Sequence, residues 1–368
     1  MEASLNLKAD RVIRVARPSM TVAEANALRE CIVDNQISAG ERCVSFEKRF
    51  ANLHNRKYGV TCNSGTTAIE LALRAMDIGA GSTVAMPTMT MVACPNATIH
   101  AGATPVFVDS IPETGNAEWR VRHGGCFIEP AQADAYLPVH LYGVSCDFSE
   151  VDRERVIEDC SEAHFGSFRD GKPLGSKGRI GVWSFFANKI VTTSEGGLVA
   201  TDDDEIEQRL RSLRAHAFTP GDHFHHTELA MGCRMTELQA AIGLAQLERK
   251  DWILSQREQV ACWYREMLDC WWLETMMRPP GSVWWVYPVL IRKGSAYSKE
   301  EVRRYLHEHG VETRSFFKPM HQQPHLKEFA KGKYPVADDL HERGFYLPLF
   351  PDMTIADVEY ICDLLGEL

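Results

Sequence analysis

Two side chains in this sequence have the type and the surroundings that carbonyl and amine chemistry needs. Lys189 follows the apolar run 182–186 and precedes Glu195-Gly196-Gly197. Burial after such a run lowers the pKa of a lysine and makes its amine nucleophilic. Asp159 ends a second apolar run, where the ligands of open α/β sheets lie. A carboxylate there keeps a pyridine nitrogen protonated, so that the ring can withdraw electrons from a carbanion. A surface lysine and a helix-capping aspartate are the structural alternatives.

A third segment could bind an anion. Residues 63–67 (NSGTT) lie between the apolar run 58–62 and a helical run that begins at Ala68. A strand, a turn of small residues and a helix point backbone N–H groups at a phosphate. Because small residues also form ordinary helix caps, this pattern alone leaves phosphate binding and simple capping open.

The elements that must position these residues alternate between short apolar runs and helical runs. This alternation predicts a mostly parallel sheet with helices on both faces. The expected strands are 58–62, 83–86, 104–108, 137–141, 156–157, 182–186 and 197–201. Thr21 and Glu24 form a capping box for a helix over 21–35, and a long helix over 234–250 continues into 251–269. Residues 111–135 have little periodicity and should form an irregular excursion.

Three parts are expected along the chain. Residues 1–40 should pack on a small C-terminal domain, 41–269 should form a large cofactor-binding domain, and 270–368 should form the small α/β domain. Within this last part the sequence predicts a strand over 284–292 and helices over 298–310 and 354–366.

Composition excludes several classes of protein. The 368 residues carry a formal net charge of −10, which argues against nucleic-acid and membrane-surface binding. No run of about 18 apolar residues is present, and residues 1–14 lack the apolar core of a signal peptide. The 11 cysteines form no CxxC pair, which predicts reduced thiols in a cytoplasmic protein. Near His223, His225 and His226 the spacing of a zinc site is missing, so we expect no metal.

Eight motifs together carry a resemblance that covers residues 15–368. They are NSGTTAIELAL, GATPVFVDS, VHLYG, EDCSEAHFG, SFFANK, SEGGLVATDD, RMTELQAAIGLAQLER and PMHQQP…LPLFP, in this order. The set resembles the DegT/DnrJ/EryC1/StrS family of sugar aminotransferases, which are fold-type I enzymes dependent on pyridoxal 5′-phosphate (PLP). EDC-x-EA and SFF-x-NK are most similar to the GDP-perosamine synthases within it. The resemblance implies a large domain with a mostly parallel mixed sheet flanked by helices, and a smaller C-terminal α/β domain.

Residue by residue, the resemblance assigns the cofactor contacts. Lys189 forms the Schiff base with PLP and moves the proton, and Asp159 binds the pyridine nitrogen. Glu162 lies near the phenolic oxygen, although a surface carboxylate is its structural alternative. The residues implied for the phosphate are Ser64, Gly65, Thr66 and Ser184, with Asn188 as a helper.

The resemblance also implies residues near the substrate, and the sequence departs from the family at others. His164, Arg314 and His321 match positions near the sugar nucleotide, with a structural histidine as the alternative at 164. Met91 stands where relatives have an aromatic residue over the PLP ring; its thioether can still pack there. Gly232 replaces an asparagine that reaches the phosphate of the neighbouring subunit in relatives. Region 111–155 is shorter or more irregular than in the family.

The reaction implied by the resemblance is transfer of an amino group from an amino acid, expected to be L-glutamate, to a keto sugar nucleotide such as GDP-4-keto-6-deoxymannose. A homodimer is implied as well. Three alternatives stay open: an aminotransferase for a non-sugar carbonyl or a modified nucleotide, a non-catalytic PLP-fold binding protein, and a sugar dehydratase. Dehydratase relatives replace the Schiff-base lysine with histidine, and this sequence retains Lys189.

Overall fold

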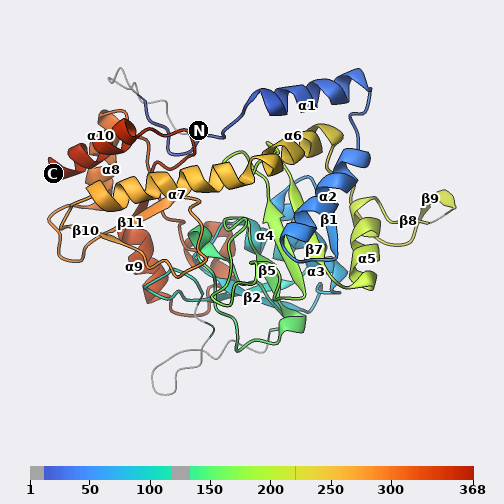
Figure 1. Cartoon of the computed structure of the whole chain (residues 1–368). Coiled ribbons are helices and arrows are strands. Elements are labelled where there is room, and N and C mark those ends of the chain that lie inside the picture. Colours follow the sequence, from blue (N-terminus) through green and yellow to red (C-terminus); the bar gives the residue numbers. More distant parts are fainter. Residues whose placement is uncertain (1–11, 118, 120–132, 220) are drawn as a thin grey trace.

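The computed structural model describes residues 12–117, 119, 133–219 and 221–368 (Figure 1). Helix α1 (Val22–Val33) is capped by Thr21, whose side chain accepts from Ala23 N, and Glu24 completes the capping box, as predicted. Helix α2 (Glu41–Leu53) follows. Most of the predicted excursion 111–135 lies outside the described residues.

The central sheet consists of two hydrogen-bonded groups of strands, ordered β1-β7-β6-β5 and β3-β2-β4. Their bounds are β1 Tyr58–Cys62, β2 Thr83–Pro87, β3 Thr104–Val108, β4 Ala135–Tyr136, β5 Ile157–Asp159, β6 Ile180–Ser184 and β7 Gly197–Thr201. Parallel bridges from Tyr136 to Val156 and from Val139 to Asp159 join the two groups. Strand β7 runs antiparallel to β1 and β6, whereas the other pairs are parallel. The prediction of a mostly parallel mixed sheet is confirmed.

Helices cover both faces of this sheet. Successive residues of a strand point to opposite sides, so each strand contributes side chains to the packing on both faces. Val182 and Val199 join the core that contains α3 (Gly65–Ala75) and α5 (Asp204–Arg214), together with α4 (Ala93–His100). Trp183 and Leu198, one residue away, join the other core with α2 and α6 (Glu237–Glu248). The sheet therefore separates two hydrophobic cores, and the carboxyl ends of β5 and β6 lie between them.

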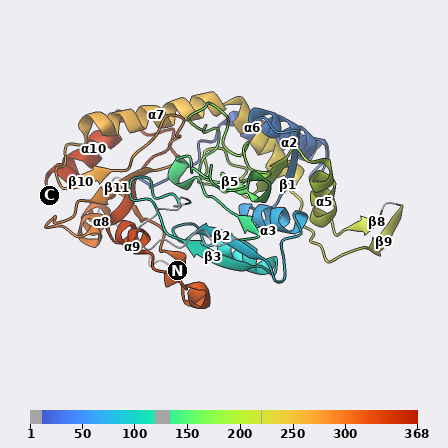
Figure 2. The same cartoon turned by 90° about the horizontal axis from the view of Figure 1, so that it is seen from below.

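The C-terminal part forms a second, antiparallel sheet in the order β10-β11-β13-β12. Its strands are β10 Leu273–Thr275, β11 Tyr287–Ile291, β12 Arg314–Ser315 and β13 Gly344–Leu347; its helices are α8 Lys299–Glu308, α9 Pro335–Arg343 and α10 Ile355–Gly366. Short 3₁₀ turns lie at Arg153–Arg155, Met320–Gln322 and Pro324–Phe329. Helix α7 (Lys250–Met267) runs from α6 along the molecule to α10 (Figures 1 and 2).

Two predicted elements differ from the structure. The expected strand 137–141 is wrong for most of its length, because β4 ends at Tyr136 and a 3₁₀ turn begins at Leu141. Side chains bind the backbone there: Asn116 Oδ1 accepts from Leu141 N, and Glu162 accepts from Tyr142 N. The continuous helix 234–269 is also wrong, since α6 ends and α7 begins around Arg249, whose ψ is 2°.

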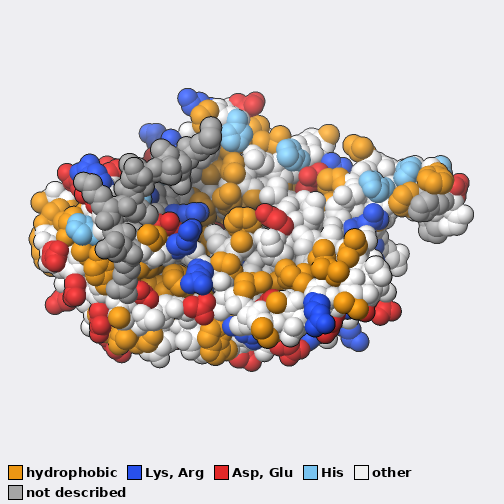
Figure 3. Space-filling model, turned by 90° about the horizontal axis from the view of Figure 1, so that it is seen from above, with side chains coloured by type: hydrophobic (Ala, Val, Ile, Leu, Met, Phe, Trp, Pro, Cys, Tyr) orange, Lys and Arg blue, Asp and Glu red, His pale blue; other side chains and the backbone are white. Residues whose placement is uncertain are grey.

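The N-terminal residues contact both parts of the molecule. Ile13 pairs with Val311, and Leu349 N donates to Val15 O, so this stretch lies on the C-terminal sheet region. Helix α1 instead packs on α6. The hairpin of β8 (Phe218–Thr219) and β9 (Asp222–His226) projects from the body (Figures 1 and 3). Among the described helices, none has the length and apolar character to span a bilayer.

Candidate active site

The first turn of α3 forms a cradle at the end of β1. Ser64 caps the helix, with its Oγ 3.2 Å from Thr67 N. The amides of the first helical turn have no partner within the helix and can bind an anion. A Cβ on Gly65 would lie 2.6 Å from the Cβ of Ser184, and one on Gly197 would lie 2.2 Å from Ser64 O. The two glycines therefore allow the helix start to touch the ends of β6 and β7.

Asp159 is the last residue of β5 and is buried. It therefore lies at the carboxyl end of its strand, as predicted. Its Oδ1 accepts from Ser161 N at 2.9 Å. Its Oδ2 lies 3.4 Å from the Sγ of Cys94, which in turn contacts Thr90 Oγ1 at 3.3 Å. Burial, reinforced by the Asp159 charge, raises the pKa of the Cys94 thiol well above its usual value, so the thiol stays protonated and donates to the carboxylate.

Lys189 follows β6 in a tight turn closed by its own N–H, which donates to Phe186 O at 2.9 Å. Its Nζ lies 4.1 Å from the centre of the Trp285 ring. Desolvation lowers the pKa of this amine, while the charges of Glu162 and Asp159 act in the opposite direction. A lysine with a lowered pKa has the free amine that nucleophilic attack and proton transfer need.

Glu162 is a buried carboxyl that faces Lys189. Burial raises its pKa to about 7, against the opposing effect of the lysine charge and of the N–H of Tyr142, which donates at 2.8 Å. Tyr142 has φ 51°, in the left-handed region where a bulky residue is rare. Its carbonyl accepts from Arg278 Nη1 at 3.1 Å. Glu162 and Arg278 therefore fix a strained peptide beside the lysine.

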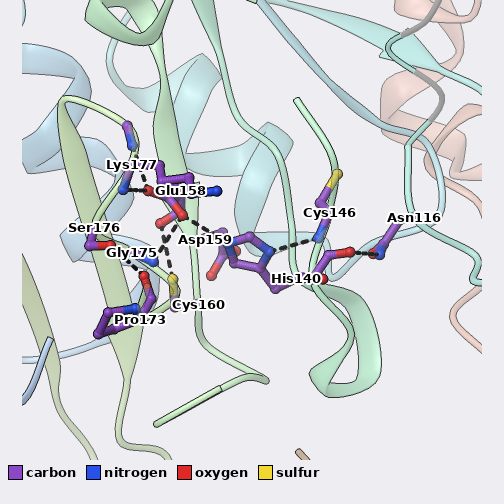
Figure 4. A network of polar contacts seen from close by, with 12 residues as sticks. Asn116, His140, Cys146, Glu158, Asp159, Cys160, Pro173, Gly175, Ser176 and Lys177 are labelled. Atoms are coloured by element: carbon purple, nitrogen blue, oxygen red, sulfur yellow. Dashed lines mark hydrogen bonds and ion pairs between the residues drawn. The ribbon is translucent and has the colours of Figure 1, made fainter. Parts of the chain in front are cut away.

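Behind Asp159 lies a network of buried polar groups centred on Glu158 (Figure 4). Its Oε2 accepts from His140 Nε2 at 3.0 Å, and His140 Nδ1 accepts from Cys146 N at 2.9 Å. The backbone donors to the carboxylate are Gly175, Lys177 and Gly178. His140, Glu158 and Cys160 bring potential metal-ligating atoms within 4.8 Å of one another, but these hydrogen bonds already occupy both Glu158 oxygens and both His140 nitrogens. The network fixes β5, and with it Asp159.

Comparison with known proteins identifies this arrangement. The sequence matches the DegT/DnrJ/EryC1/StrS aminotransferase family over residues 18–366. The chain belongs to this family. A GDP-perosamine synthase of Caulobacter vibrioides is 37% identical, covering 97% of this chain and 98% of that protein. The fold matches Helicobacter pylori PseC, an aminotransferase of pseudoaminic acid biosynthesis, with a TM-score of 0.89 at 22% identity over 97% and 99% of the two chains.

A second solved structure bears on the cofactor. Escherichia coli GDP-4-keto-6-deoxy-D-mannose-3-dehydratase with bound hydrated PLP matches with a TM-score of 0.88 at 22% identity, over 96% of this chain and all of that one. The predictions of the family, of the fold-type I architecture, of an aminotransferase and of PLP as its cofactor are confirmed.

The residues of this chain fit PLP. Gly65 lets the start of α3 lie against Ser184, so the free amides of the first helical turn and the Ser184 hydroxyl come together, which suits a phosphate. Asp159 supplies a buried carboxylate for a protonated ring nitrogen, and Lys189 a desolvated amine. Asn188 Oδ1 is buried and has no hydrogen-bond partner in the described structure, so its carboxamide is free to contact a bound group.

Two histidines predicted near the substrate bind protein groups through both ring nitrogens. His164 is fully buried, its Nε2 donates to Ser184 O at 2.9 Å, and Val191 N donates to its Nδ1 at 3.4 Å. Burial lowers the pKa of His164 well below its usual value, so the neutral ring positions the end of β6. His321 bonds through Nδ1 to Thr88 Oγ1 at 2.8 Å and through Nε2 to Asp338 Oδ1 at 2.9 Å. It therefore connects the end of β2 to helix α9.

Two other predicted residues remain accessible. Arg314, on β12, is exposed and hydrogen-bonds the hydroxyl of Tyr346, a buried side chain whose ring lies 6.1 Å from that of Tyr142. Met91 is 51% exposed after Thr90, so its thioether is free to cover a ligand. Both side chains are therefore open to solvent, and their roles toward a ligand stay predictions.

Sequence reasoning missed three residues that complete the site: Cys94, Tyr142 and Trp285. Cys94 lies on α4, 65 positions before Asp159, and no local pattern connects them. The Tyr142-Gly143 pair offered the one usable signal, because a glycine after a presumed strand indicates a turn. Trp285 reaches Lys189 from the C-terminal part, a contact that only the fold reveals.

Proposed function

We propose that this aminotransferase moves an amino group from L-glutamate to the keto group of a nucleotide sugar, with GDP-4-keto-6-deoxymannose as the specific acceptor. The observation that carries the proposal is the Lys189 amine, which faces Glu162 and Asp159 at the carboxyl ends of β5 and β6. The similarity to a GDP-perosamine synthase along nearly the whole chain supports a nucleotide-sugar acceptor.

Each residue of the site has a definite task in this reaction. Bound PLP supplies an electron sink for the carbanion. Asp159 holds a proton on the ring nitrogen, and Cys94 and Ser161 N hold the Asp159 carboxylate in place. With the cofactor bound, Nζ of Lys189 would take the proton from the donor α-carbon and pass it to the cofactor; in the second half-reaction the same amine would deliver a proton to the acceptor carbon that gains the amino group. Glu162, with a pKa of about 7, can hold or release a proton beside that amine at neutral pH.

The absorbance of the protein with PLP tests the reaction type. We expect a visible band from the cofactor bound at Lys189 that shifts when L-glutamate is added and is absent in Lys189→Ala. Lys57→Ala is the matched control, because Lys57 lies just before β1, its side chain binds Asp204 at the surface, and its loss should leave the band intact. A wild-type protein with neither band nor shift would refute the proposal.

The acceptor is tested with a panel of 3-keto and 4-keto sugars carrying GDP, UDP or dTDP, with 2-oxoglutarate formation as the readout. We expect turnover to be highest with GDP-4-keto-6-deoxymannose. A normal glutamate-induced shift without turnover of any sugar would refute the nucleotide-sugar acceptor and favour a non-sugar carbonyl.

We further propose a homodimer in the cytoplasm. Apolar side chains on and beside α1 and α2 are more than half exposed, and a band of apolar side chains crosses the face seen from above (Figure 3). The exposed residues are Val22, Ile32, Val33, Ile37 and Val44. The described cysteines are unbridged, which suits a reducing compartment. Sedimentation should show a dimer, and a fully active monomer would contradict this expectation.

A further inference from the structure

Trp285 makes specific contacts with two consecutive residues of the lysine turn. It lies just before β11, in the C-terminal part of the chain, and is 4% exposed. Its indole Nε1 donates to Asn188 O at 2.9 Å. The face of the same ring lies 4.1 Å from the Nζ of Lys189. A core tryptophan needs some partner for its N–H, but here the N–H and the ring face both contact the turn that carries the reactive amine.

The backbone of Trp285 is held from the opposite side. Arg257, a buried residue of α7, donates from Nη1 to Trp285 O at 3.1 Å and to Leu349 O at 3.4 Å. The ring itself packs near Tyr142, at 6.2 Å, and near Tyr346, at 6.3 Å. The indole therefore has little freedom to move away from the lysine.

We propose that Trp285 is a positioning residue for Lys189, which fixes the 186–189 turn through the carbonyl of Asn188 and holds the lysine amine against the face of its ring. This role rests on the proposed use of Lys189 as the cofactor lysine. In this role the C-terminal part of the chain contacts the reacting amine directly, through the Trp285 ring. Helix α7 acts on the amine indirectly, because Arg257 binds the carbonyl of Trp285.

The ring face also affects the charge of the amine. An aromatic face attracts an ammonium group, so Trp285 favours the protonated lysine. Of the other groups that face Lys189, the carboxylates of Glu162 and Asp159 favour the same form, the Cys94 thiol is neutral, and burial acts in the opposite direction and lowers the lysine pKa. The nearby imidazole of His164 is kept neutral by burial. Removing the indole should therefore lower the lysine pKa further.

The test measures this pKa in the cofactor-free protein. The protein is labelled with ¹³Cε-lysine, the Lys189 signal is identified by its loss in Lys189→Ala, and its chemical shift is followed against pH. We expect Trp285→Leu to lower the titration midpoint by about half a pH unit to one unit. Trp285→Phe, which keeps a weaker ring face, should lower it less, and should slow PLP binding because Asn188 O loses its donor.

Trp284→Phe is the matched control. The Trp284 indole bonds Glu258 at 2.8 Å and lies over Arg278, so the same loss of an indole occurs next door without contact to Lys189. Its midpoint should equal that of the wild type. A midpoint that stays constant or rises in folded Trp285→Leu would overturn the proposal. If the leucine variant does not fold, the same result in Trp285→Phe would overturn it. Because no cofactor is present, that result is distinct from failure of the glutamate-induced absorbance shift.

Discussion

The unusual proton affinity of Glu162 predicts a specific dependence of stability on pH. In the folded protein burial raises the pKa of this carboxyl from its ordinary 4.5 to about 7. The folded state therefore retains a proton that the unfolded state loses, and stability falls as the pH rises from about 4.5 to about 7. The difference between 4.5 and about 7 corresponds to about 3 kcal/mol. Glu162→Gln is neutral in both states, so it should escape this loss.

Urea denaturation of cofactor-free wild type and Glu162→Gln, at equal protein concentration and at several pH values between 4.5 and 8.5, measures the effect. The free energies of unfolding should be similar near pH 4.5, and the variant should be more stable by about 3 kcal/mol at pH 8. Glu154→Gln is the control, because that side chain is 75% exposed and its substitution should give a difference that does not change with pH. A pH-independent difference for Glu162→Gln would refute the reasoning.

Three further substitutions test the geometry of the site. Gly65→Ala places a Cβ 2.6 Å from that of Ser184, and overpacking of about 1–3 kcal/mol should weaken PLP binding about tenfold or more in an absorbance titration. Cys94→Ala removes the thiol donor to Asp159, which is worth about 1 kcal/mol, and should weaken PLP binding about fivefold in the same titration, whereas Cys94→Ser should retain most of it. Glu158→Gln should lower the free energy of unfolding by about 3–5 kcal/mol and reduce the thermal midpoint by several degrees, and an unchanged midpoint would contradict the proposed role of that network.

The sequence predicted the elements whose periodicity or capping is local. The capping box at Thr21, the strands 104–108 and 197–201, and the start of α3 beside the small-residue turn all follow from patterns within a few residues. The strand expected over 137–141 failed because distant side chains bind its backbone. Alternating apolar residues cannot reveal that Glu162, twenty positions later, accepts from Tyr142 N and bends the chain.

The two buried glutamates of the EDCSEA motif show why the protonation states of the site need the structure. Glu158 and Glu162 are both buried, and burial alone would raise both pKa values. Glu158 accepts from His140 and three backbone amides, so its pKa is lowered and it stays charged. Among the described residues one backbone group, Tyr142 N, donates to Glu162, and the pKa of Glu162 rises to about 7. The number of donors, set by the loop 173–178 on one side and the turn at Tyr142 on the other, separates a structural anion from a proton-exchanging group beside Lys189.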